Sequence, residues 1–131
     1  MRAKAREFRF AIDLGARMRT EDGTPLDADA SWTAEHLLLA ALVRCSVASL
    51  DYHAHRAGNR VETSKGSARA LFTRRDSDDR YAATEIEVDL DIELLEQPGE
   101  DELNELLLKA ERDCFIGASL TAKPVYHWHV R

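Results

Sequence analysis

Two cysteines and one carboxylate are the residues of this chain whose types and spacing indicate chemistry. Cys45 lies in the middle of an apolar stretch, and the only other cysteine, Cys114, lies near the end of a second apolar pattern. Glu35 precedes Cys45 by ten residues and stands at the start of the same stretch. A thiolate attacks electrophiles, and two thiols that meet can be oxidised to a disulfide. The hypothesis is therefore a redox pair made by the two cysteines.

Each cysteine also has a purely structural explanation. Free cysteine is among the most buried residue types and often only fills space in a core. Cys45 and Cys114 both fall on faces that should point inward, and this placement suits a core residue and a redox pair equally well. A disulfide requires Cα atoms within ~7 Å of each other, and the sequence leaves that distance open.

The histidines and the clustered carboxylates predict no metal site. His53 and His55 are two residues apart on an expected helix, so their side chains point in different directions. His127 and His129 share one face of an expected strand, but the sequence suggests no third ligand for them. The carboxylates of residues 85–93 lack the spacing of a calcium loop and suit a solvated strand face. We expect neither a metal nor a cofactor.

The composition describes an ordinary soluble domain. The chain has 131 residues, of which 44% are hydrophobic and 32% charged, so residues 1–131 should form one domain with a packed core. A net charge of −6 disfavours nucleic acid as a partner. No secretory signal or membrane span is expected, because no apolar run approaches the ~20 residues that a span needs. The prediction is a cytoplasmic protein, in which a static disulfide would be unusual.

A long buried helix should carry Cys45. The segment TAEHLLLAALVRCSVASLDY is apolar on nearly all sides in its central part, which is typical of a helix at the centre of a fold. Thr33 is a suitable N-cap, since its hydroxyl can accept a hydrogen bond from a free first-turn N–H group. Gly58-Asn59 is a stop signal just after Arg56. The helix should therefore extend from Thr33 to about Arg56.

The other elements are strands and a second helix. Strict alternation of apolar and polar residues predicts strands, helical spacing of leucines predicts the second helix, and an acidic cluster predicts a hairpin turn. Cys114 continues the apolar stripe of that helix, and Gly117 should lie just beyond its end. This order indicates an α+β class in which an antiparallel sheet packs on helices. The expected elements are strands 7–14, 61–74, 84–95 and 125–131, the helix 100–113, and turns at 21–23 and 76–79.

Three stretches resemble the family of osmotically inducible protein C and the organic hydroperoxide resistance proteins (OsmC/Ohr). The first is TAEHLLLAAL, a glutamate and an alanine-rich helix that lead to Cys45. The second is KAERDC, which resembles the family's helix with the second cysteine, and the third is GASL before the last strand. The order of the elements also fits over about residues 5–131. The chain departs from the family where Ala34 and Phe115 replace frequent prolines.

The resemblance implies a fold and an activity. The fold is OsmC-like: a curved antiparallel sheet wrapped around central helices, in an intertwined homodimer. The activity is a thiol-dependent peroxidase acting on organic hydroperoxides, with Cys45 as the attacking thiol, Cys114 as the resolving thiol and Glu35 as an active-site glutamate. The family's thiolate-binding arginine matches Arg17 or Arg19, and we favour Arg17. An external dithiol, lipoyl or thioredoxin-like, would reduce the disulfide.

The spacing of Glu35 and Cys45 constrains this hypothesis. Ten residues of straight helix correspond to ~15 Å of rise and ~80° of rotation. One unbroken helix therefore keeps Glu35 and Cys45 out of a common site. Either the helix is broken, or Glu35 serves the Cys45 of a second chain, which we favour. The non-enzymatic alternative is an OsmC-like protein that binds a small apolar ligand, with both cysteines as core residues.

Overall fold

The computed structural model describes residues 5–9, 20, 22–27 and 31–131, which form two separate units, Met1–Thr33 and Ala34–Arg131. In the first unit, the Gly23 N–H group donates a 3.0 Å hydrogen bond to the Thr20 carbonyl. Gly23 has a φ of 91°, which glycine adopts without steric cost. The predicted turn is thus confirmed at Asp22-Gly23. Residues 7–9 of the predicted first strand have no regular secondary structure, and residues 10–14 lie outside the described residues.

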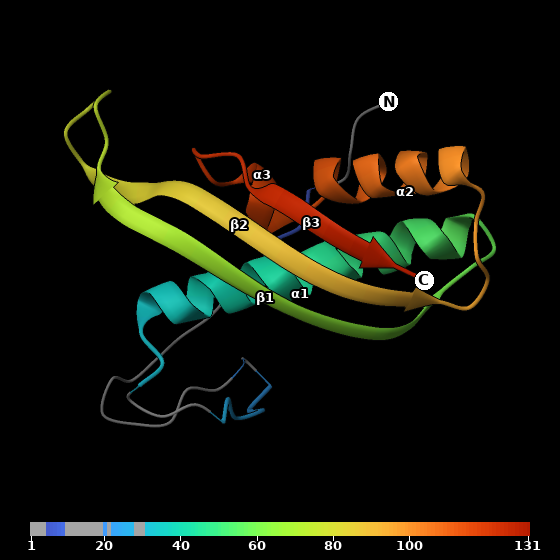
Figure 1. Cartoon of the computed structure of the whole chain (residues 1–131). Helices are drawn as coiled ribbons and strands as arrows, with labels where there is room; N and C mark the ends of the chain where they lie inside the picture. The colour runs from blue at the N-terminus through green and yellow to red at the C-terminus, as the bar shows by residue number, and fades with distance from the viewer. Residues whose placement is uncertain (1–4, 10–19, 21, 28–30) are drawn as a thin grey trace. The chain divides into compact units, whose positions relative to one another are not determined.

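The second unit contains three helices and three strands (Figure 1). The long helix, the second helix and all three strands lie where the sequence patterns predict them, within a few residues at each end. The long helix begins at Ala34, directly after the expected cap Thr33, and ends at Arg56. The elements are α1 Ala34–Arg56, β1 Val61–Arg74, β2 Tyr81–Leu94, α2 Glu100–Arg112, α3 Phe115–Ala118 and β3 Val125–Val130.

The three strands form one mixed sheet in the order β1-β2-β3. β1 and β2 are antiparallel and are joined by the predicted hairpin turn, where Asp79 adopts a φ of 59°. β3 is parallel to β2, with Val125 beside Glu87 and Val130 beside Ile92. The expectation of an antiparallel sheet is therefore wrong for this pair. The chain leaves β2, crosses over through α2 and α3, and returns in the same direction, as a parallel connection requires.

One face of this sheet carries the core. Residues at alternate positions of β2 are buried and the intervening positions face outward, which confirms the predicted alternation. The outward positions carry charges that pair across strands, such as Arg69 with Glu87 at 2.5 Å. A sheet with one buried face and one solvated face is what this pattern predicts. The buried β2 residues are Ile86, Val88, Leu90, Ile92 and Leu94.

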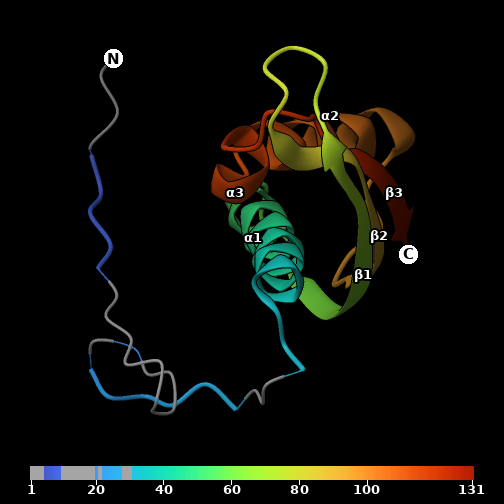
Figure 2. The ribbon, with the colours of Figure 1, turned by 90° about the vertical axis from the view of Figure 1, so that its left-hand side faces the viewer.

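Helix α1 lies on the concave side of the curved sheet, with α2 packed beside it (Figure 2). Close approach of α1 to β1 depends on Gly66, because a Cβ atom there would lie 2.8 Å from the Val43 side chain. Only one stripe of α1 is fully covered: Leu42, Ser46, Leu50 and Ala54. The length and apolar composition of α1 would also suit a membrane span, but core helices of soluble proteins meet the same criterion.

Two side chains of α1 connect it to the end of α2. The Ser49 hydroxyl donates a 2.7 Å hydrogen bond to the Ala110 carbonyl. His53 Nε2 lies 2.7 Å from Oδ2 of Asp113, the residue after the last turn of α2. The Ala110 carbonyl near the end of α2 and the capping residue Asp113 are therefore both held against α1. These contacts fix the place where the chain leaves α2, and Cys114 is the next residue.

Candidate functional site

Cys45 lies halfway along α1 and is half-buried. Its side chain interacts with the side chain of Cys114 and with the backbone N–H groups of Phe115 and Ile116. These partners belong to α3 and to the residue that precedes it, so the start of α3 lies against Cys45 of α1. The structure therefore brings together the two cysteines that the sequence singled out. Both are free thiols here.

Cys114 is placed by a break between two helices. The sequence pattern predicts that it continues the stripe of α2, but α2 ends at Arg112 and Cys114 is the N-cap of α3. Its sulfur accepts a 3.4 Å hydrogen bond from the Gly117 N–H group. Gly117 accordingly lies inside α3 and not just beyond a helix end, which corrects the prediction. Cys114 has no exposed surface.

The described surroundings of Cys45 favour its neutral thiol. Burial raises the pKa of Cys45 above its usual value, and the neighbouring Cys114 raises it further. The N–H groups of Ile116 and Phe115 act in the opposite direction, because they stabilise the thiolate. The net direction is upward, so these contacts alone do not activate the thiol. A cation near the sulfur would be needed to lower this pKa.

Two hydroxyl groups complete the surroundings of Cys114. The Ser46 hydroxyl lies 3.6 Å from the Cys114 sulfur and 2.9 Å from the Tyr126 hydroxyl. Sequence reasoning did not assign a role to either residue. A polar residue beside Cys45 in an otherwise apolar helix was a usable signal for Ser46. Tyr126 lies on the face of β3 that is partly buried, which alternates with an exposed face.

The other two predicted site residues do not join the cysteines within the described chain. Helix α1 is continuous from Ala34 to Arg56, which removes the possibility of a break between Glu35 and Cys45. Glu35 is exposed in the first turn, ten residues before Cys45. Arg17 and Arg19 lie outside the described residues. A role for Glu35 beside Cys45 therefore requires a second chain.

Three histidines lie close to carboxylates. His127 Nε2 and His129 Nε2 each lie 3.7 Å from a carboxylate oxygen, of Glu87 and Asp89 respectively. His53 pairs with Asp113, as described above. No group of three potential metal ligands occurs among residues 5–9, 20, 22–27 and 31–131.

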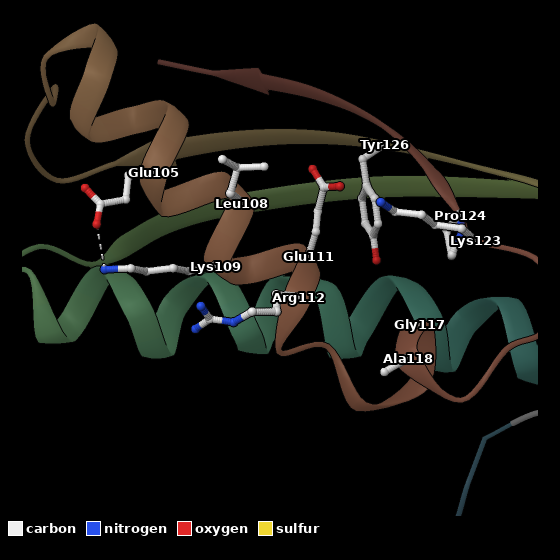
Figure 3. Close-up of a pocket in the computed structure, with 10 residues that line it drawn as sticks. All are labelled: Glu105, Leu108, Lys109, Glu111, Arg112, Gly117, Ala118, Lys123, Pro124 and Tyr126. Carbon is white, nitrogen blue, oxygen red and sulfur yellow. Dashed lines mark ion pairs between the residues drawn. The ribbon is translucent and has the colours of Figure 1, made fainter.

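A groove of about 640 Å³ lies between α2, α3 and the start of β3, and neither cysteine is among its lining residues. In Figure 3 the Tyr126 ring stands at this groove with its hydroxyl pointing toward α1. Three basic residues and two acidic residues line the groove, and one pair of them, Lys109 and Glu105, is 3.1 Å apart. The basic residues are Lys109, Arg112 and Lys123, and the acidic residues are Glu105 and Glu111.

The fold is α+β, and the candidate site consists of two interacting thiols. One thiol belongs to the central helix α1, and the other belongs to the N-cap residue of the short helix α3. A profile of OsmC-like proteins matches residues 27–128, most of the chain. The chain therefore belongs to the OsmC-like protein family, and this confirms the resemblance of the cysteine-containing stretches. No curated protein sequence matches it.

Solved structures of OsmC-like proteins share this fold. An OsmC-like protein from Vibrio cholerae is 16% identical with a TM-score of 0.71, over 86% of this chain and 82% of that chain. An OsmC-like protein from Mycoplasma pneumoniae is 14% identical with a TM-score of 0.63, over 79% and 77%. The organic hydroperoxide resistance protein OhrB of Bacillus subtilis is 15% identical with a TM-score of 0.54, over 88% and 89%. At these identities the likeness shows the fold alone.

Proposed function

We propose that this protein is a thiol-dependent peroxidase that reduces organic hydroperoxides through Cys45 and Cys114. The observation that carries the proposal is the interaction of the two thiols, which come from helices far apart in the sequence. Membership of the OsmC-like family and the shared fold with organic hydroperoxide resistance proteins support it.

Their unequal exposure supports Cys45 as the attacking thiol and Cys114 as the resolving thiol. Cys45 is half-buried and retains a solvent-accessible part, whereas Cys114 has 0% exposure. A hydroperoxide can therefore reach the Cys45 sulfur first. Cys114 is protected from the oxidant and reacts only with an oxidised neighbour, which is the part of a resolving thiol.

The reaction has three balanced steps. The Cys45 thiolate attacks one peroxide oxygen, the O–O bond breaks, and the departing alkoxide takes up a proton to leave as an alcohol. Cys45 is then a sulfenic acid. The Cys114 sulfur attacks the Cys45 sulfur, a disulfide forms, and the hydroxyl group leaves with a proton as water. An external dithiol reduces this disulfide by thiol exchange and is itself oxidised to a disulfide.

Activation of Cys45 is the step that the described contacts do not provide, since burial and Cys114 raise its pKa. A guanidinium group, which we assign to Arg17, would lower that pKa, and Glu35 of a second chain would orient the guanidinium. The proposal therefore includes a homodimer. Helix α1 supports it, because the central part of this helix is apolar on nearly all sides but is fully covered along only one stripe.

The remaining features of the proposal concern the partners. The reductant is an external dithiol, of either the lipoyl or the thioredoxin-like type, because the cycle leaves an internal disulfide. A cytoplasmic location would supply such dithiols. No metal or organic cofactor enters any step.

Thiol counting after peroxide addition tests the proposal. One equivalent of cumene hydroperoxide is added to the reduced protein, and free thiols are counted after denaturation. We expect the wild type to lose both thiols. Cys114→Ser should lose its one thiol to a sulfenic acid that dimedone traps, and Cys45→Ser should keep its thiol. Unchanged thiols in the wild type at excess hydroperoxide would contradict the proposal.

The groove between α2 and β3 supports a second candidate function, the binding of a small ligand without peroxidase chemistry. It has a volume of about 640 Å³, within the range of ligand pockets, and adjoins the inward-pointing Tyr126. Under this alternative the thiols would survive hydroperoxide, and Leu108→Trp in the groove wall would abolish ligand binding. The thiol count therefore separates the two functions.

A further inference from the structure

Ser46 is the centre of a buried hydrogen-bond network around the resolving cysteine. Its side chain is 1% exposed, and its hydroxyl donates a 2.7 Å hydrogen bond to the Leu42 carbonyl one turn earlier in α1. A serine hydroxyl has a single proton and two acceptor lone pairs. Because the proton is committed to Leu42, the Ser46 oxygen can only accept from its other neighbours.

Since the Ser46 oxygen can only accept, the direction of its remaining hydrogen bonds is fixed. The Tyr126 hydroxyl, 2.9 Å away, must donate to Ser46. The Cys114 thiol, 3.6 Å away, must also donate to Ser46. The Gly117 N–H group donates to the Cys114 sulfur from another side at 3.4 Å. The proton of Cys114 is thus aimed at Ser46, and a sulfur lone pair is left free to face Cys45.

Tyr126 is itself held in place from the sheet and from α2. Its ring stacks on the Trp128 ring with centroids 5.4 Å apart and planes 9° from parallel. The Trp128 indole N–H group donates a 3.0 Å hydrogen bond to Glu111 of α2. Burial raises the pKa of the Tyr126 hydroxyl far above its usual value, so it remains a donor at every physiological pH. Figure 3 shows this hydroxyl pointing toward α1.

We propose that Ser46 and Tyr126 are positioning residues for the second chemical step, in which Cys114 attacks the sulfenic acid of Cys45. This inference rests on the proposed peroxidase function and extends it. Ser46 accepts the hydrogen bond of the Cys114 thiol and so holds its sulfur in the orientation for attack, while Tyr126 fixes the Ser46 oxygen. As the S–S bond forms, the thiol proton passes from Cys114 to the hydroxyl group that leaves Cys45, water departs, and Ser46 keeps its own proton on the Leu42 carbonyl throughout.

Once Cys45 is a sulfenic acid, it can react in two ways. A sulfenic acid that is not resolved reacts with a second hydroperoxide and becomes a sulfinic acid, which is an irreversible loss in most proteins. Fast attack by Cys114 prevents this loss. Ser46 and Tyr126 therefore determine how much hydroperoxide the protein survives, without touching the hydroperoxide themselves.

The test follows the two steps separately in the full-length protein. Reduced wild type, Tyr126→Phe and Ser46→Ala are mixed with cumene hydroperoxide, and sulfenic acid and disulfide are quantified by mass spectrometry after rapid quenching. We expect the first step to be unchanged. Disulfide formation should slow roughly tenfold in each variant, the scale of one lost hydrogen bond, and the sulfinic fraction at excess hydroperoxide should rise.

Ala54→Gly is the matched control for a general weakening of the helix packing. Ala54 lies on the same buried stripe of α1 as Ser46, about two turns later, and has no polar side-chain atom. Disulfide formation in this variant should match the wild type. If Ser46→Ala does not fold, Tyr126→Phe still tests the proposal, because it removes one hydroxyl and keeps the stacked ring.

The pH dependence distinguishes positioning from a purely structural effect. Hydroxide can remove the Cys114 proton, and a thiolate needs no hydrogen-bond acceptor to orient it, so the defect of each variant should shrink as the pH rises, whereas a misplaced helix would slow the step equally at every pH. Wild-type rates of disulfide formation in both variants would overturn the inference. A wild type that forms no sulfenic acid or disulfide would instead overturn the proposed peroxidase function.

Discussion

His53 Nε2 lies 2.7 Å from Oδ2 of Asp113, the residue that directly precedes Cys114. Arg112 binds the same carboxylate, with Nη2 2.8 Å from Oδ2. The carboxylate of Asp113 therefore joins the end of α1 to the end of α2, next to the resolving cysteine. The position of Cys114 depends on this contact as well as on local helix geometry.

The first prediction concerns acid stability. Hydrogen bonding by Arg112, and to a smaller degree by His53, lowers the pKa of Asp113 to about 2. A carboxylate with a pKa below its unfolded value of 3.8 stabilises the folded state above about pH 4, and this contribution is lost as the pH falls toward 2. Asp113→Asn should remove that part of the acid dependence.

Urea unfolding between pH 5 and about 2.5 measures the effect. The free energy of unfolding should fall less steeply with acid in Asp113→Asn than in the wild type. Asp91→Asn is the control, because Asp91 forms no ion pair within the part of the chain that the structure describes. Equal slopes for Asp113→Asn and the wild type would show that the pair does not stabilise the fold.

The second prediction concerns the close approach of α1 to β1. A Cβ atom at Gly66 would lie 2.7 Å from the Leu90 side chain and 2.8 Å from the Val43 side chain. Gly66→Ala should therefore lower the free energy of unfolding by about 1–3 kcal/mol, as overpacking does in other cores. Ser67→Ala, on the exposed neighbouring position, should change it by less than about 0.5 kcal/mol.

A double-mutant cycle with Val43→Ala checks the cause. If the clash with Val43 is responsible, the double variant Val43→Ala/Gly66→Ala should be more stable than the sum of the two single effects predicts. If the effects of the two substitutions are additive, the destabilisation by Gly66→Ala does not arise from the contact with Val43.

The third prediction concerns the activation of Cys45. The contacts around it raise its pKa, and we assign the opposing charge to Arg17. Arg17→Ala should then raise the apparent pKa for alkylation of Cys45 by iodoacetamide and slow the reaction with hydroperoxide roughly 100-fold at pH 7, as the loss of one stabilising group does in other enzymes. Arg19→Ala is the matched control. If Arg19→Ala shows these effects and Arg17→Ala does not, the assignment to Arg17 is wrong.

The fourth prediction concerns Glu35 and the second chain. Since α1 is continuous, Glu35 can act on Cys45 only across a dimer. Glu35→Gln and Cys45→Ser should each be inactive as homodimers. Co-expression with different tags should yield a mixed dimer with one working site, built from the Cys45 of one chain and the Glu35 of the other. An inactive mixed dimer would exclude this arrangement.

Helices, strands and inward-facing residues could be predicted from local patterns. The period of two in residues 84–95 and 125–131, and the continuous apolar character around Cys45, reflect burial on one side or on all sides. These patterns involve residues that are neighbours in the chain, so they can be recognised without knowledge of the fold. The cysteines, with their flanking residues, also pointed to the OsmC-like family that the profile match confirms.

Only the tertiary structure determined how these pieces meet. The parallel pairing of β2 with β3 follows from the path of the crossover through α2 and α3, which no local pattern encodes. The break before Cys114 depends on contacts of Ser49 and His53 with the end of α2, because side chains of α1 hold that end. The network of Ser46, Tyr126 and Cys114 likewise joins residues that are distant in sequence. Hydrogen-bond partners of this kind are set by packing in three dimensions, and sequence spacing carries no information about them.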